Sequence, residues 1–386
     1  MGRSEPVIRR RKRICVNALL LPPTFGGIGN VAYHVLRELV VAHPEWEFTL
    51  LVSAATAPHF LTLPGIRLQI IGIRSRLGRH AYLHLIYPVI ATRFDLVHSV
   101  GNIGMIMGSC AQVITIHDAY EHVSPERFSF AKRILMRLLI SRSGKIAKRI
   151  IAISESTRRD IEKFYPQFLG KISMVYSGNK FPLNREASPD GRDGFLFVGT
   201  LEPGKNLPLV LKAFARFLKT LSADSLRVSQ GLEAPMPKTV LRIAGAKGWK
   251  QSTLPYLISS LEISDDVEFL GFVTDERLLT EYSRSLGLIQ AASYEGFGLP
   301  VLEAMACGCP VIAARNSGLI EAGGNAALFF ETGREEELSL LMSRIYNDRH
   351  LREACIQKGL VHAADFTWSR TAEKVGEIFA SILTKA

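Results

Sequence analysis

The sequence predicts an α/β protein of two domains, each built on a doubly wound parallel sheet of the Rossmann-like kind. The chain has 386 residues, whereas ~100–200 residues are usual for one domain. Short apolar runs rich in β-branched residues alternate with longer helical patterns, which is typical of βαβ units and parallel sheets. Twelve such runs are too many for one sheet of ordinary size.

The first domain is expected over residues 1–180. Its predicted strands are 14–20, 48–53, 67–72, 95–99, 112–117, 149–154 and 172–176, and its clearest helical patterns are 28–42, 127–148 and 155–164. A polar segment at 179–193, with two prolines and no periodicity, predicts the domain boundary.

The second domain is expected over residues 181–365. Its predicted strands are 195–200, 239–244, 267–271, 286–291 and 310–314, with helices at 206–221, 275–284 and 334–347. Residues 222–238 interrupt this rhythm, and we expect them to form a surface loop.

Composition excludes several classes of protein. A hydrophobic content of 47% with 22% charged residues indicates a globular chain. The five cysteines cannot form a dense disulfide framework, which fits a reducing cytosol. No uninterrupted apolar run reaches the ~20 residues of a membrane span, and the N-terminus does not have the pattern of a secretory signal.

The net charge of +11 is concentrated in the first half of the chain. Residues 1–180 hold 25 basic and 11 acidic residues, net +14, whereas residues 181–386 hold 22 and 25, net −3. One contribution is the basic tract at 9–13, and another is the segment 128–149, where lysines and arginines interleave with Ile and Leu. This segment is either a helix lying on an anionic membrane or an ordinary half-buried helix. Nucleic acid is disfavoured, because we find no recognisable nucleic-acid-binding motif.

The most informative stretch is SYEGFGLPVLEAMACGCPV at 293–311. A strand ending at residue 291 is followed by a glycine-rich turn and a helix that runs to about residue 306 and stops at Gly308, with Pro300 in the first turn. The backbone N–H groups of such a helix start bind anions. Glu295 just before the helix, and Glu303 expected in its first turn, suit a ligand with hydroxyls beside its phosphates, namely a sugar nucleotide. The alternative is a capped helix with two surface glutamates.

Two further glycine turns follow predicted strands. GTLEPGKN at 199–206 places Lys205 at a strand-to-helix turn, where a lysine commonly neutralises phosphate. GGIGN at 26–30 resembles a truncated dinucleotide turn. No acidic residue ends a second strand at the required place, so hydride transfer is disfavoured.

These residues resemble a known family, the retaining glycosyltransferases of family 4 with the GT-B fold. The matching motifs span nearly the whole chain: FGGIGNVAYHV, VITIHDAY, IIAISESTRRDI, FLFVGTLEPGKN, VEFLGFV and YEGFGLPVLEAMACGCPVIA. The last is the most specific, because it combines two glutamates with flanking glycines. The resemblance implies two facing domains with an inter-domain cleft, and a final segment, 366–386, that crosses back to the first domain.

The resemblance also implies the donor site. Glu295 would lie near the hydroxyls of the transferred sugar, Glu303 would hydrogen-bond the ribose, and Lys205 would bind the diphosphate and stabilise the leaving group. The remaining donor-binding residues would be Thr200, Phe272, Val273, Gly296, Phe297, Gly298 and Leu299.

On the acceptor side, the resemblance implies that Gly26 and Gly27 let a loop approach the donor phosphate and the acceptor. His117 would contact the donor sugar, and Asp118 would support the acceptor side. No cofactor and no metal ion are expected. Two departures from the family, Gly204 and Thr200 where relatives have arginine, concern phosphate binding.

Other conspicuous residues are expected to be structural. Cys307 and Cys309 lack partner ligands at metal-binding spacing, and packing is the favoured explanation for them. The same holds for Trp249 and Trp368, and for the packing or surface histidines His80, His84 and His98.

The resulting prediction is a retaining glycosyltransferase acting at the inner face of the cytoplasmic membrane on a lipid-linked or polysaccharide acceptor. The string Gly-Thr-Leu-Glu-Pro resembles mannosyltransferase-like branches, so GDP-mannose is the favoured donor and a UDP-sugar is possible. Two alternatives stay open: a sugar-nucleotide epimerase of GT-B-like fold, and a nucleotide-sugar-binding module without catalysis.

Overall fold

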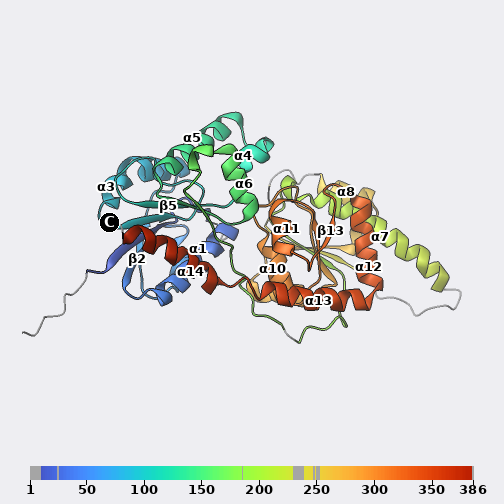
Figure 1. Ribbon diagram of the computed structural model, residues 1–386. Helices are drawn as coiled ribbons and strands as arrows, with labels where there is room; N and C mark the ends of the chain where they lie inside the picture. Colours follow the sequence, from blue (N-terminus) through green and yellow to red (C-terminus); the bar gives the residue numbers. More distant parts are fainter. Residues whose placement is uncertain are drawn as a thin grey trace, which may run out of the picture. The chain divides into compact units, whose positions relative to one another are not determined.

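The computed structural model describes residues 10–23, 26–184, 186–228, 239–246, 248 and 253–384 (Figure 1). The chain forms two compact units, one of residues 1–178 with 368–386 and one of residues 179–367. The expected boundaries were 180/181 and 365/366. Trp249 and part of the basic tract at 9–13 lie outside the described residues.

The first unit contains a parallel sheet with the order β3-β2-β1-β4-β5-β6-β7 in its described part. The strands are β1 Lys12–Asn17, β2 Trp46–Ser53, β3 Ile66–Ile71, β4 Leu96–Ser99, β5 Gln112–Ile116, β6 Arg149–Ala152 and β7 Ile172–Met174. The order reverses between β1 and β4, which is the topological switch point of a doubly wound sheet.

Helices cover both faces of this sheet (Figure 1). One face packs against α1 (Gly27–Ala42) and α14 (Trp368–Leu383), through a core that includes Leu36, Phe48 and Phe379. The other face packs, near β1, against a short segment made of α2 (Arg76–Ala81), the π-helical turn η2 (Tyr82–Ile86) and α3 (Tyr87–Ala91). Near β5 and β6 the core includes residues of α5 (Phe130–Ile146) and α6 (Glu155–Phe164).

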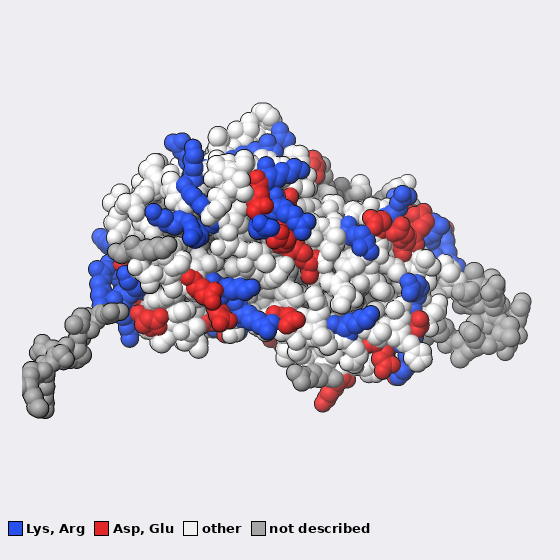
Figure 2. Space-filling model, in the orientation of Figure 1, with Lys and Arg blue, Asp and Glu red and all other residues white. Residues whose placement is uncertain are grey.

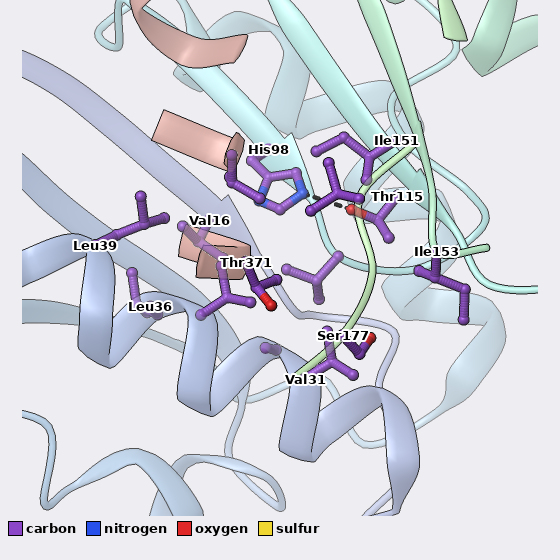
Figure 3. A pocket seen from close by; sticks show the side chains of 15 residues that line it. Val16, Val31, Leu36, Leu39, His98, Thr115, Ile151, Ile153, Ser177 and Thr371 are labelled. Atoms are coloured by element: carbon purple, nitrogen blue, oxygen red, sulfur yellow. Dashed lines mark hydrogen bonds between the residues drawn. The ribbon is translucent and has the colours of Figure 1, made fainter. Parts of the chain in front are cut away.

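A small cavity lies between α1, the sheet and α14 (Figure 3). Its volume is about 30 Å³, and apolar side chains form most of its lining. His98 faces it and hydrogen-bonds through Nε2 to Thr115 Oγ1 at 2.8 Å. Burial lowers the pKa of His98 to about 3, so this imidazole is neutral at pH 7. His98 is therefore a packing histidine, and His84 is also buried.

The second unit contains a parallel sheet with the order β10-β9-β8-β11-β12-β13 in its described part. The strands are β8 Phe195–Val198, β9 Leu241–Ala244, β10 Val267–Gly271, β11 Gly287–Gln290, β12 Val311–Ala314 and β13 Leu328–Phe330. The helices are α7 Leu207–Val228, α8 Leu254–Ser260, α9 Asp275–Arg284, α10 Leu299–Ala306, α11 Ser317–Gly323, α12 Glu335–Asn347 and α13 Arg349–Ala363. Two parallel, doubly wound sheets confirm the predicted fold class.

The expected loop at 222–238 was wrong in part, and one strand of this sheet was not predicted. Residues 222–228 are not loop, because α7 continues to Val228; residues 229–238 of the expected loop lie outside the described residues. Strand β13 was not predicted, since its three residues give no measurable alternation.

Candidate functional site

The loop after β8 carries the first candidate residue of the second unit. Gly199 to Asn206 leads from the carboxyl end of β8 to the start of α7, and Pro203–Lys205 form a single 3₁₀ turn. Asn206 ends that turn with a left-handed φ of 57°. Thr200 is exposed, and its carbonyl accepts a hydrogen bond from the Glu202 N–H at 2.8 Å.

The loop after β11 lies on the other side of the switch point of this sheet. Because β8 and β11 are neighbours, their carboxyl ends open at the place where doubly wound sheets bind ligands. The N–H of Ser293 in the second loop donates to the carbonyl of Gly204 in the first, at 3.0 Å. A backbone hydrogen bond thus joins the two loops.

Lys205 and Glu295 meet between these loops. Lys205 Nζ forms an ion pair and hydrogen bond with Glu295 Oε1, and both side chains are largely buried. The backbone of Glu295 is also held, because its N–H donates to Ser317 Oγ at 2.9 Å and its carbonyl accepts from the Gly318 N–H at 3.1 Å. A cation and a carboxylate are therefore fixed side by side at the carboxyl ends of β8 and β11.

Helix α10 begins directly after this pair. Gly298 is its N-cap, with φ 120° and no side-chain cap hydrogen bond. A Cβ at Gly298 would come within 2.9 Å of Leu319 Cδ2, so the turn requires glycine. Gly296 and Phe297 are buried, Leu299 opens the helix, and Pro300 lies in its first turn as predicted. The N-terminal, positive end of the α10 dipole therefore lies beyond the carboxyl end of β11.

Glu303 lies in the second turn of α10 rather than in the first, because the helix begins at Leu299. It is buried, with Oε2 accepting from the Tyr282 hydroxyl at 3.0 Å and Oε1 3.8 Å from Lys180 Nζ. Lys180 is also paired with Asp275. Burial raises the pKa of Glu303, an effect that the charge of Lys180 opposes.

Tyr282, Lys180 and Ser317 were not identified from the sequence. Tyr282 lies on α9 and Lys180 in the segment before β8, so neither is near the glycine-rich motifs along the chain. No sequence signal separates them from ordinary surface residues. Phe272 and Val273 directly follow β10, and Phe272 is 74% exposed.

The first unit gathers its predicted residues at the carboxyl ends of its own strands. Gly26 and Gly27 open α1 and are exposed, and a Cβ at Gly27 would contact nothing within 4 Å. His117 and Asp118 follow β5. Asn102, which the sequence analysis missed, accepts from the His117 N–H at 2.8 Å and donates to Asp118 Oδ1 at 3.3 Å.

His117 is buried, and its ring has a defined tautomer. Nε2 lies 2.7 Å from the carbonyl of Val100, and a carbonyl only accepts, so Nε2 carries the proton. Burial lowers the pKa of His117 to about 4, so the ring is neutral at pH 7.

Cys307 and Cys309 are buried, and burial raises the pKa of both thiols. Within the part of the chain that the structure describes, no group of three His, Cys, Asp or Glu could hold a metal ion. In the same part, no helix is both long and apolar enough to cross a membrane.

Two family models match the chain, one for each domain. Residues 25–178 match Glycosyltransferase Family 4, and residues 181–361 match Glycosyl transferases group 1.

Curated relatives at low identity carry related names. The chain is 27% identical over 267 residues to the O-antigen chain mannosyltransferase B of Escherichia coli, covering 66% of each chain. It is 28% identical over 270 residues to the O-antigen chain mannosyltransferase RfbU of Salmonella typhimurium, covering 70% of this chain and 69% of the relative. The chain thus spans about two thirds of the length of these relatives.

Solved structures share the fold. Sucrose-phosphate synthase from Thermosynechococcus elongatus superposes with a TM-score of 0.76 at 17% identity, covering 97% of this chain and 100% of that one. HepE from Anabaena, solved with UDP-glucose, superposes with a TM-score of 0.72 at 18% identity, covering 96% and 99%. A glycosyltransferase family model matches each half of the chain, and each half contains a parallel sheet as in the GT-B fold, so the chain belongs to the glycosyltransferases.

Proposed function

We propose that this protein transfers a sugar from a nucleoside diphosphate donor to a lipid-linked or polysaccharide acceptor, with retention of anomeric configuration. The observation that carries the proposal is the Lys205–Glu295 pair at the switch point of the second sheet, directly before α10. A cation suits a diphosphate and a carboxylate suits sugar hydroxyls, so a ligand with both groups fits this place.

In the proposed reaction, the bond between the anomeric carbon and the diphosphate oxygen breaks and the electron pair leaves with the diphosphate. Lys205 and the N-terminal end of α10 stabilise that charge. The acceptor hydroxyl attacks the face from which the diphosphate departs, and its proton leaves with the nucleoside diphosphate. Breaking the Lys205–Glu295 pair on donor binding would free the Glu295 carboxylate to accept a hydrogen bond from a sugar hydroxyl.

The other predicted residues divide between the sugar nucleotide and the acceptor. Glu303 binds the ribose, and the backbone at Phe272 and Val273 meets the base. Around the diphosphate and the sugar lie Thr200, Gly296, Phe297, Gly298 and Leu299. In the first unit, Gly26 and Gly27 approach the donor phosphate, neutral His117 contacts the sugar, and Asp118 supports the acceptor.

Mannose is the favoured sugar, because the two O-antigen relatives are named mannosyltransferases. GDP-mannose is accordingly the first donor to test. A UDP-sugar is the second, because the Anabaena neighbour was solved with UDP-glucose.

The proposed place of action is the inner face of the cytoplasmic membrane. Helix α5 supports this, because Phe130, Leu135 and Leu138 are 69%, 52% and 61% exposed beside exposed lysines and arginines. An exposed apolar face with surrounding basic residues is typical of a peripheral membrane surface.

A thermal-shift panel of GDP-, UDP-, ADP- and dTDP-sugars tests the donor site. We expect one nucleotide class to raise the melting temperature, because a ligand that binds only the folded state stabilises it. Lys205→Ala should remove most of that shift. A matched control is Lys212→Ala on α7, which removes the same charge from an exposed position and should leave the shift intact. A full shift in Lys205→Ala would contradict the assignment.

Product analysis separates transfer from the two alternatives. A transferase releases nucleoside diphosphate faster when an acceptor is added, whereas an epimerase converts the donor without an acceptor. Donor binding with no turnover would indicate a binding module. The anomeric configuration of the product, read by NMR, tests retention.

A further inference from the structure

A second cavity of the first unit lies at the amino ends of its strands, whereas Gly27 and His117 follow the carboxyl ends. It has a volume of about 310 Å³ and is lined by β1, β2, β3 and the turn after α3. Its polar lining consists of Arg13, Arg67, Arg93, Glu47, Thr49 and Gln69. Ligands of doubly wound sheets bind at the carboxyl ends of the strands, so this cavity is separate from the sites described above.

Strand register brings these side chains to one face. Arg13 is paired with Glu47, and Thr49 is paired with Arg67, across three adjacent strands. The same face carries Cys15, Leu51 and Ile71 further along the strands, where η2 and α3 cover it. Toward the amino ends of the strands, the same face of the sheet therefore carries polar residues, and these line the cavity.

The arginines of this cavity have no carboxylate partner among the described residues. The register of β1 and β2 places Glu47 opposite Arg13, yet among the described residues no ion pair within 4.0 Å involves Arg13, Arg67 or Arg93. Arg13 Nε is buried and has no hydrogen-bond partner. A buried donor without a partner is costly. Arg67 and Arg93, both exposed, add two further positive charges to the lining of the same hollow.

An anion in the cavity would accept a hydrogen bond from the buried Arg13 donor and would be attracted by all three positive charges. Guanidinium groups bind phosphate oxygens through paired hydrogen bonds. The volume is at the lower end of small-molecule sites, ~300–1,000 Å³, and is larger than one phosphate ion needs. Glu47, Thr49 and Gln69 can hydrogen-bond hydroxyl groups on the same ligand.

We propose that this cavity binds a phosphorylated, hydroxyl-bearing small molecule, either free in solution or as the head group of a lipid. The site is distinct from sugar transfer and does not depend on the proposed donor site.

Binding of glycerol 3-phosphate by calorimetry tests the proposal. We expect binding to the native chain and equally to Lys205→Ala, because the candidate donor site is not involved. The double variant Arg67→Gln/Arg93→Gln should lose at least ~10-fold in affinity, because two charge-assisted contacts are removed. The matched control Arg334→Gln/Arg344→Gln removes two charges from exposed positions at α12 of the second unit and should bind as the native chain does.

Vesicles distinguish the two sources of the ligand. If the source is a lipid, the double variant binds vesicles containing phosphatidylglycerol more weakly than the control variant does; if the source is soluble, the two bind vesicles alike while glycerol 3-phosphate still discriminates them. Two outcomes overturn the proposal: neither ligand distinguishes the double variant from its control, or Lys205→Ala abolishes glycerol 3-phosphate binding.

Discussion

Individual charged residues of the second unit are held by one another rather than by solvent. Glu295 is paired with Lys205, and Glu303 is held by Tyr282 and Lys180. The glycine-rich motifs identify both glutamates, because glycines and a first-turn proline mark a ligand-binding turn. The motifs could not identify Tyr282 or Lys180, because these residues reach Glu303 only through the fold.

This arrangement predicts that Tyr282 positions Glu303 for the ribose. Tyr282→Phe removes the 3.0 Å hydrogen bond to Glu303 Oε2, and we expect ~10-fold weaker binding of the nucleoside diphosphate identified by the thermal-shift panel. The 2′,3′-dideoxy analogue should bind the variant and the native chain equally, because it has no ribose hydroxyl that could donate a hydrogen bond to Glu303.

Tyr256→Phe is the matched control, since Tyr256 is exposed on α8. A purely structural role for Tyr282 would weaken both nucleotides alike, and that result would contradict the prediction.

At the scale of elements, periodicity predicted most of both sheets and failed in identifiable places. Strands such as β2 and β10 have long apolar or alternating runs, and helices α6 and α9 match their predicted ranges. Segment 76–91 was not predicted, because Pro88 and a π-helical turn break its 3.6-residue period. The end of α7 was mistaken for loop, because Ser222, Asp224 and Ser225 interrupt its apolar period.

Helix α14 shows how an element distant in sequence completes a core. Its residue Phe379 is fully buried in the first unit, with ring centroids 5.3 Å from His98 and 6.2 Å from Trp46. Phe379→Ala should destabilise this unit by ~3–5 kcal/mol, because a large buried ring leaves a cavity. Urea unfolding followed by tryptophan fluorescence measures the change, with Trp249→Phe introduced in all variants so that only Trp46 and Trp368 emit.

Lys374→Ala supplies the comparison, because Lys374 is exposed on the same helix. Its effect should stay within about 0.5 kcal/mol. Equal midpoints for Phe379→Ala and the native chain would show that α14 does not stabilise the first unit.

At the scale of the whole molecule, the positions of the motifs along the chain predicted more than the overall composition of the chain did. A net charge of +11 indicated an anionic partner but no particular kind. The sequence motifs assigned the donor residues to the second half, which is nearly neutral, and left the excess of +14 to residues 1–180. The position of that charge on the surface required the fold: Figure 2 shows Lys and Arg side chains over the part of the first unit that contains α5.

This charge predicts salt-sensitive membrane binding. We expect the chain to bind vesicles containing phosphatidylglycerol at low salt, to dissociate at high salt, and to ignore phosphatidylcholine vesicles. Each Lys or Arg near an anionic surface contributes ~1 kcal/mol, and salt screens this attraction. Leu135→Gln/Leu138→Gln should weaken binding at constant net charge, because it removes exposed apolar side chains of α5.

Leu340→Gln controls for the loss of an exposed leucine, since Leu340 is 62% exposed on α12 of the second unit. This variant should sediment with vesicles as the native chain does. If neutral vesicles bind as well as anionic ones, charge does not direct the association. If the α5 variant binds like the Leu340 control, the exposed face of α5 is an ordinary solvated helix surface, and the basic residues attract the membrane without insertion of apolar side chains.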